Sequence, residues 1–133
     1  METLSITTTL KHPRRVTGHT THRILRTIKD HILGASYTLS VVYVGERRSQ
    51  TLNRTYRGKD HPTNILSFPL AHNEGELFIT LPLAEKEARR YRRTPKEHIR
   101  ALFIHGCLHL KGLRHGATMD REEKRWQKKF LSL

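Results

Sequence analysis

The chain has 133 residues, which suits one domain with a single hydrophobic core and leaves little room for a second. Its 25 lysines and arginines against 12 acidic residues give a net charge of +13, which favours a polyanionic partner such as nucleic acid or anionic lipid. No stretch approaches the roughly 20 apolar residues that span a bilayer, and residues 1–6 do not resemble a secretory signal. Nucleic acid is therefore the better partner, although charge alone is equally consistent with simple solubility.

Helices and strands alternate in the first half of the predicted chain, and the last three predicted elements are helices. The first predicted elements are a strand over residues 4–10, a loop over 12–19, a helix from Thr20 or Thr21 to Gly34, and a strand over 37–44. A helix from about Arg47 to the turn at 57–60 and strands over 64–68 and 76–80 follow. The last elements are helices over 82–91, over 94–111 and from Asp120 onwards. We expect Pro69 to close the third strand. The prediction is an α+β domain over residues 1–133, with a small mixed four-stranded sheet covered by about five helices.

The most informative segment is the end of the helix over 94–111 and the residues after it. His105 and His109 are four residues apart, so both side chains point to the same side of the helix. A straight helix would place His115 about 15 Å further along its axis than His105, out of reach of a shared ion. Gly112 resolves this, because a left-handed glycine ends a helix and allows the following residues to fold back.

Three imidazoles without a fourth protein ligand are typical of a catalytic zinc site, because an open position remains for water. Zinc lowers the pKa of a coordinated water to about 7, which supports hydrolysis at cellular pH. We therefore predict one Zn²⁺ per chain, held by His105, His109 and His115.

The other histidines fit this site less well. His98 is about 10.5 Å from His105 along the helix, too far to share the ion, and is a candidate for the wall of the cleft. The remaining histidines we interpret as ordinary surface groups: His12, His19, His22, His31, His61 and His72. Cys107 should face the core as a small buried hydrophobe, and as the lone cysteine it agrees with a reducing, cytoplasmic location.

The histidine spacing matches the zincin pattern H-E-x-x-H-x-x-G-x-x-H in every position but one. Gly106 stands where such peptidases carry the glutamate that acts as general base. RNA cleavage does not need that glutamate, because the substrate supplies its own 2′-OH nucleophile and the metal can stabilise charge on phosphoryl oxygens. RNA is also attracted by the positive charge.

Two segments resemble the YbeY endoribonucleases, a family of bacterial ribosomal RNA maturation factors. Residues 105–115 resemble the signature H-G-x-L-H-L-x-G-[YF]-D-H. Residues 52–69, Leu-Asn-Arg-Thr-Tyr-Arg-Gly-Lys-Asp-His-Pro-Thr-Asn-Ile-Leu-Ser-Phe-Pro, are similar to the second signature, L-N-x-x-Y-R-x-K-D-x-P-T-[DN]-V-L-S-F. The two segments and the elements between them cover about residues 37 to 130.

The resemblance implies a zinc-dependent, single-strand-specific endoribonuclease with Arg57, His105, His109 and His115 as catalytic residues. It further implies a role in maturing the 3′ end of 16S ribosomal RNA and in ribosome quality control. The implied partners are precursor ribosomal RNA and the small ribosomal subunit, with neither DNA nor membrane. The residues do not indicate the oligomeric state.

Two departures from the family pattern are visible. Arg114 replaces the usual aspartate before the last histidine, and Glu76 replaces the aspartate of a Gly-Asp-Ile strand. Neither change removes a metal ligand. Arg57 also suits phosphate contact on chemical grounds, because a guanidinium can bind two phosphate oxygens at once.

Three hypotheses remain open from the sequence. The first is the endoribonuclease, with either the 2′-OH or water as nucleophile. The second is a minimal metalloprotease in which another carboxylate, such as Glu76, replaces the missing base. The third is an RNA-binding assembly factor in which the zinc is structural and contributes folding energy.

Overall fold

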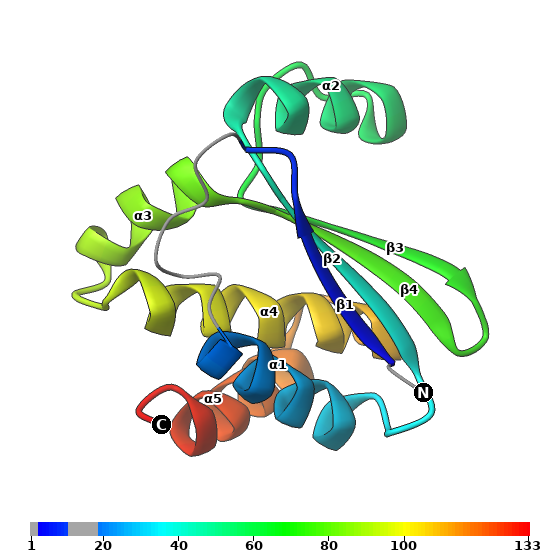
Figure 1. The fold of residues 1–133 in the computed structure, drawn as a ribbon, viewed down its shortest axis with the longest axis vertical. Helices are drawn as coiled ribbons and strands as arrows, with labels where there is room; N and C mark the ends of the chain where they lie inside the picture. Colours follow the sequence, from blue (N-terminus) through cyan, green and yellow to red (C-terminus); the bar gives the residue numbers. More distant parts are fainter. Residues whose placement is uncertain (1–2, 11–18) are drawn as a thin grey trace.

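The computed structural model describes residues 3–10 and 19–133, which form four strands and five helices (Figure 1). In chain order these are β1 (Leu4–Thr8), α1 (His19–Ile32), β2 (Thr38–Val44), α2 (Glu46–Arg57), β3 (Ile65–Ala71), β4 (Glu74–Thr80), α3 (Leu81–Arg90), α4 (Pro95–Lys111) and α5 (Ala117–Phe130). The predicted α+β class is confirmed. Within the described part of the chain, no helix is both long and apolar enough to cross a bilayer.

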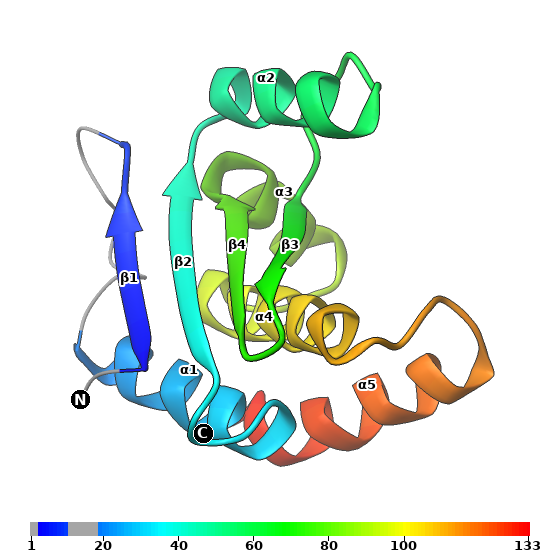
Figure 2. The same cartoon turned by 90° about the vertical axis from the view of Figure 1, so that its right-hand side faces the viewer.

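The sheet is mixed, with the strand order β1-β2-β4-β3. β1, β2 and β4 run parallel, whereas β3 pairs antiparallel with β4 and forms one edge of the sheet. Leu39, Val41 and Tyr43 alternate along β2 toward the buried face. Helices α3 and α4 lie behind the sheet in Figure 2, while α2 lies across one end of the strands.

Helix α4 lies at the centre of the helical layer because it is apolar on nearly all sides. Ile99, Phe103 and Ile104 are fully buried, in contact with the sheet and the neighbouring helices. The helix begins with the predicted capping box, in which Thr94 and Glu97 each accept a backbone N–H bond from the other. It therefore holds the histidines at its end on a rigid support.

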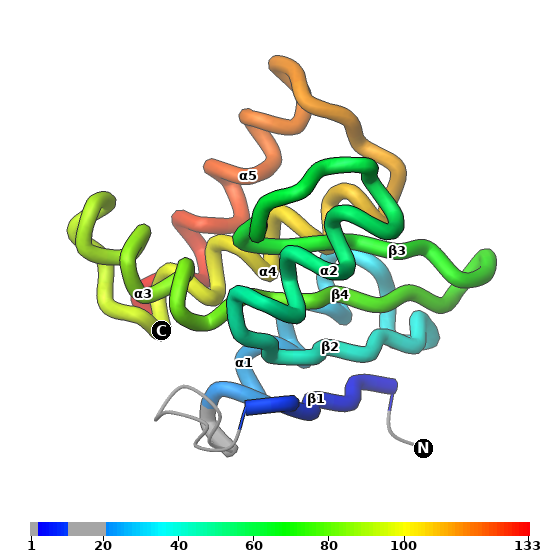
Figure 3. The backbone as a smooth tube through the Cα atoms, turned by 90° about the horizontal axis from the view of Figure 1, so that it is seen from above, coloured from blue at the N-terminus to red at the C-terminus, as the bar shows by residue number. Residues whose placement is uncertain are grey.

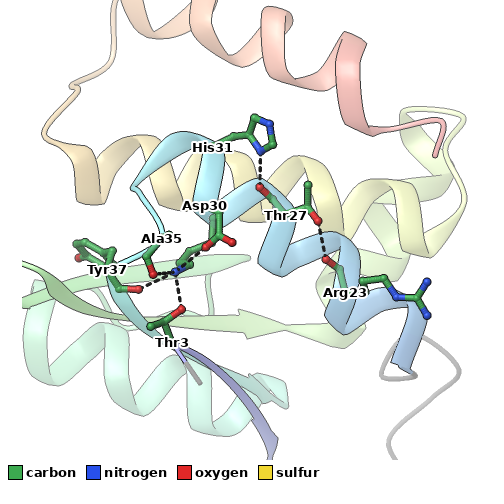
Figure 4. A network of polar contacts seen from close by, with 8 residues as sticks. Thr3, Arg23, Thr27, Asp30, His31, Ala35 and Tyr37 are labelled. Atoms are coloured by element: carbon green, nitrogen blue, oxygen red, sulfur yellow. Dashed lines mark hydrogen bonds and ion pairs between the residues drawn. The ribbon is translucent and has the colours of Figure 1, made fainter. Parts of the chain in front are cut away.

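A fully buried lysine joins the first strand to the first helix, which the sequence did not indicate. Lys29 Nζ donates to Thr3 Oγ1 at 2.8 Å and to the carbonyls of Ala35 at 3.1 Å and Tyr37 at 2.8 Å (Figure 4). The carboxylate of Asp30 lies 2.8 Å away and balances the charge. These partners compensate for the water that the ammonium group loses on burial.

Several predicted boundaries were wrong: β1 ends at Thr8 rather than at residue 10, and β4 begins at Glu74 rather than at residue 76. β3 continues through Pro69 to Ala71, with an irregularity in its pairing, because an edge strand tolerates a residue that lacks an N–H. α5 begins at Ala117 rather than Asp120, after Gly116 with its φ of 152°. α1 begins at His19, so Thr20 lies inside the helix, while most of the predicted loop over 12–19 falls outside the described residues.

Candidate functional site

Three histidines converge where α4 ends. His105 and His109 lie one turn apart, and their ring centroids are 4.6 Å apart. His115 follows the helix, with its ring centroid 5.5 Å from that of His105 and 5.0 Å from that of His109. One ligand atom from each residue lies within 4.8 Å of the other two. As expected, the chain after α4 folds back and places His115 beside His105 and His109, and the three histidines could hold one metal ion.

Gly112 produces the bend that returns the chain. Its φ of 109° lies in the left-handed region, which glycine adopts without the steric cost of a Cβ. The N–H of Gly112 donates to the carbonyl of His109, and the N–H of Leu113 donates to that of Leu108, each at 3.0 Å. These bonds form a Schellman cap, which fixes the direction of the segment that carries the third histidine.

Two of the imidazoles have their protons fixed on Nδ1. His105 Nδ1 donates to Glu123 Oε1 on α5 at 2.6 Å, and His109 Nδ1 donates to the carbonyl of Leu113 at 3.2 Å. Both Nε2 atoms therefore present lone pairs, and these atoms lie 3.1 Å apart. Two facing lone pairs repel each other unless a cation lies beside both. The donor set thus fits a metal ion.

The environment of His109 favours its neutral form. Burial lowers the pKa of His109, the neighbouring His105 and His115 lower it further, and the carbonyl of Leu113 opposes the effect only partly. A neutral imidazole is the form that binds a metal, so the site is prepared for its ligand at neutral pH.

Close packing explains why glycine occupies the position of the peptidase glutamate. A Cβ on Gly106 would lie 2.8 Å from Ile65 Cδ1 and 2.8 Å from Leu77 Cδ2. Leu77 therefore faces α4, and its neighbour Glu76 faces the opposite side of the sheet, away from the histidines. The expectation that Glu76 could replace the missing base is not supported by this placement.

The histidines lie at one end of a cleft of about 870 Å³, here called the basic cleft. It runs along the edge strand β3, and Figure 3 shows the α2–β3 and α4–α5 connections on this side of the sheet. Its cationic residues are Arg57, Lys59 and Arg114. No aspartate or glutamate lines it within the described part of the chain. The basic cleft therefore suits an anionic ligand.

Arg57 is held in the basic cleft by two contacts with β3. Its guanidinium donates to the carbonyl of Ser67 at 2.8 Å and lies 5.1 Å from the centroid of the Phe68 ring. The exposed donors of the group remain free to meet a ligand. Arg57 thus lies in the same cleft as the three histidines, as the sequence predicted.

A second, smaller hollow adjoins the site on the other side of His105. This Tyr91 pocket, named after the tyrosine in its wall, has a volume of about 230 Å³ and lies between α3, α4 and α5. It shares Asn64 and His105 with the basic cleft. His98 lies in its wall, so the expectation that His98 lines the cleft itself was wrong.

Comparison with known proteins supports the resemblance seen in the sequence. A family model described as "Endoribonuclease YbeY" matches residues 6–131. The chain belongs to this family.

Relatives within the YbeY family cover most of the described chain. Proteins named "Endoribonuclease YbeY" from Cupriavidus necator and Cupriavidus metallidurans are 41% and 38% identical over 96 residues. This chain spans about half of their length, 48% and 49%. The solution structure of TM1509 from Thermotoga maritima is 25% identical, covers 97% of this chain and 89% of its own, and has a TM-score of 0.69.

Several residues differ from their predicted setting. Arg114, which replaces the aspartate of the YbeY signature, is exposed in the basic cleft and adds a cation there. His61, predicted to be an ordinary surface group, also lines this cleft. Glu123 was missed, because no sequence pattern connects it with His105. His12 lies outside the described residues.

The predictions for Cys107, His31 and His72 agree with the structure, whereas His22, predicted to be an ordinary surface group, is half-buried on α1. Cys107 is fully buried, as predicted, and burial raises the pKa of its thiol, so the group is unreactive. His31 and His72 are exposed and lie outside both hollows. His31 donates to the carbonyl of Thr27 on the surface of α1 (Figure 4).

Proposed function

We propose that this chain is a zinc-dependent endoribonuclease that cleaves single-stranded RNA. The observation that carries this proposal is the convergence of three imidazoles in the wall of a cleft whose charged residues, within the described part of the chain, are all cationic. Membership of the YbeY family supports the reaction class, and the relatives named above carry the word endoribonuclease in their names.

We propose that one zinc ion is held by the Nε2 atoms of His105 and His109 and by one ring nitrogen of His115. Bound in this way, zinc would polarise a phosphoryl oxygen and lower the pKa of a coordinated water. Glu123 would orient His105 and the carbonyl of Leu113 would orient His109, because each fixes one ring nitrogen as a donor.

Arg57 would bind the scissile phosphate. Its contacts with Ser67 and Phe68 place a planar cation in the cleft before the substrate arrives, so little reorganisation is needed when negative charge develops. Lys59 and Arg114 would attract the RNA backbone without reading its sequence. The chemical nature of the products would identify the nucleophile, since a 2′,3′-cyclic phosphate indicates the 2′-OH and a 5′-phosphate indicates water.

The family resemblance extends the proposal to a cellular role. We propose that the substrate is precursor 16S ribosomal RNA, cut near its 3′ end, and that the protein acts on the small ribosomal subunit in the cytoplasm, including in quality control. We also propose that residues 1–133 act as one domain. A single hydrophobic cluster containing residues from β1 to α5 supports this.

The decisive experiment compares two histidine variants on precursor ribosomal RNA. His109→Ala should lose both zinc and cleavage while it remains folded, because a catalytic site is not required for the core. His72→Ala is the matched control, since His72 is exposed and lies outside the basic cleft. Cleavage by zinc-free His109→Ala would overturn the proposal. Unfolding of His109→Ala upon zinc loss would instead favour a structural zinc in an RNA-binding assembly factor.

A further inference from the structure

The Tyr91 pocket has no role in the mechanism described so far, although it touches the metal site. Asn64 and His105 form part of both hollows, so the pocket adjoins the basic cleft at the metal-ligand candidate His105. A cavity of about 150 Å³ accommodates benzene. The volume of about 230 Å³ therefore suits a single heterocyclic base rather than a whole nucleotide.

A chain of hydrogen bonds holds the pocket wall rigid. Gln127 Oε1 accepts from Arg93 at 3.4 Å, and Arg93 donates to His98 Nδ1 at 3.3 Å. His98 Nε2 donates to Glu87 Oε1 at 2.9 Å, and Asn64 donates to both oxygens of the same carboxylate at 3.1 and 3.2 Å. His98 is only 3% exposed. The chain runs from α5 to the segment before β3, so the wall is formed before any ligand arrives.

Tyr91 provides a flat surface at the pocket. It is 58% exposed, which is unusual for a large aromatic side chain in this protein. Its ring stacks on that of His98, with 5.4 Å between centroids and 17° between planes, and the guanidinium of Arg93 also lies over this ring, 5.2 Å from its centroid. A rigid, exposed aromatic ring is a common platform for an unpaired base.

The charges of the pocket are unfavourable for phosphate. Glu87 and Glu123 contribute two carboxylates, against the single cation Arg93. A phosphate would be repelled here and attracted to the basic cleft, which has three cations. A neutral base with hydrogen-bond donors meets no such repulsion.

We propose that the Tyr91 pocket binds an unpaired nucleobase whose Watson–Crick edge carries an exocyclic amine beside an unprotonated ring nitrogen, which means adenine or cytosine. This proposal rests on the proposed function, because the base would belong to a nucleotide next to the scissile phosphate. Within the described residues, Glu123 Oε2 and Gln127 Nε2 have no protein partner, and the two residues lie one turn apart on α5. The amine donates to Glu123 Oε2 and the ring nitrogen accepts from Gln127 Nε2, while the base stacks on Tyr91.

The test uses nucleosides, which have no phosphodiester bond and therefore report binding independently of cleavage. The ¹⁵N-labelled, zinc-loaded chain is titrated with adenosine, purine riboside and ribose 5-phosphate, and the side-chain amides of Gln127 and Asn64 serve as probes. Adenosine should shift the Gln127 amide and bind at least about fivefold more tightly than purine riboside, which differs only in lacking the amine. Ribose 5-phosphate should leave the Gln127 amide unchanged.

Two tyrosine variants connect the binding to the pocket. Tyr91→Ala should weaken adenosine binding about tenfold, because stacking on the ring is lost. Tyr56→Ala is the matched control, since Tyr56 is 62% exposed but belongs to α2, outside the pocket. Spectra of both variants, compared with the unmodified chain, verify that each is folded.

The possible results separate this proposal from the proposed function. The proposal of a base pocket would be overturned if adenosine and purine riboside bound equally tightly. It would also be overturned if Tyr91→Ala and Tyr56→Ala lost the same fraction of the affinity for adenosine. A shift of the Gln127 amide by spermidine but not by adenosine would do the same, because the pocket would then be a cation site. RNA cleavage, measured in parallel, tests the proposed function independently of the base pocket, since cleavage depends on the histidines and Arg57.

Discussion

The basic cleft and the Tyr91 pocket meet at His105 and Asn64, but their walls differ in charge and in rigidity. The cleft carries Arg57, Lys59 and Arg114 without an opposing carboxylate in the described part of the chain, and these side chains are exposed. The pocket wall contains a buried histidine and a continuous series of hydrogen bonds.

This difference indicates a division of roles around one metal site. Exposed cations attract any RNA backbone, because every nucleotide carries the same phosphate. Fixed donors and acceptors distinguish between bases, because each base presents a different pattern. On the proposals above, the basic cleft would supply affinity for the RNA backbone and the Tyr91 pocket would supply selectivity for the base, with His105 lining both.

The largest expected effect concerns the cleft. Arg57→Ala should reduce cleavage by about 10²- to 10³-fold in every sequence context, because charge on the scissile phosphate loses a positioned donor. Zinc content should not change. Arg48→Ala, an exposed charge at the other end of α2, is the control and should cleave normally. A loss confined to particular base contexts would contradict the assigned role of Arg57.

The next effect concerns Glu123, which accepts a hydrogen bond from His105 and also lines the Tyr91 pocket. Glu123→Ala should lower zinc affinity by about 10- to 100-fold, because His105 loses the acceptor on Nδ1. Competition with a chelating dye measures this directly. Glu122→Ala removes only an exposed ion pair with Arg125 and should bind zinc normally. Equal affinity in the two variants would show that Glu123 does not support the site.

A smaller effect tests the packing beneath the site. Gly106→Ala should destabilise the fold by about 1–3 kcal/mol, because the new Cβ would overlap Ile65 and Leu77 in a closely packed interface. Urea unfolding of the metal-free chain gives the free energy of unfolding. A stabilised variant, as the helix propensity of alanine alone would produce, would contradict the close approach of α4 to the sheet.

The smallest expected effect is a lowered pKa of the His109 imidazole. In the metal-free chain, NMR should place the pKa of His109 below the roughly 6.5 of a solvated histidine. Because the folded chain then binds this proton less readily than the unfolded chain, His109 contributes stability that is fully present above the unfolded pKa and is lost as the pH falls through the lower folded pKa. A midpoint above that of a solvated histidine would show that His109 is not held neutral by burial.

The sequence predicted the convergence of the three histidines well because the information for it is local. The capping box at Thr94, the spacing of His105 and His109, and the stop at Gly112 all lie within one helix and its cap. The resemblance added Arg57, whose place in the cleft depends on a distant strand.

Other features could not be read from the sequence because they depend on tertiary contacts. Glu123 is eighteen residues from His105 and reaches it from another helix. The buried ammonium group of Lys29 donates hydrogen bonds to backbone carbonyls, and such partners leave no pattern in the sequence. Pro69 continues a strand only because β3 lies at the edge of the sheet, and strand order is not a local property.

The most direct test of the central claim is X-ray absorption at the zinc edge, together with a count of zinc per chain. One zinc per chain with three imidazole nitrogens at about 2.0–2.1 Å is the result that the histidine geometry predicts. Zinc coordinated by fewer imidazoles, or the same spectrum from His115→Ala, would show that the three histidines do not share one ion.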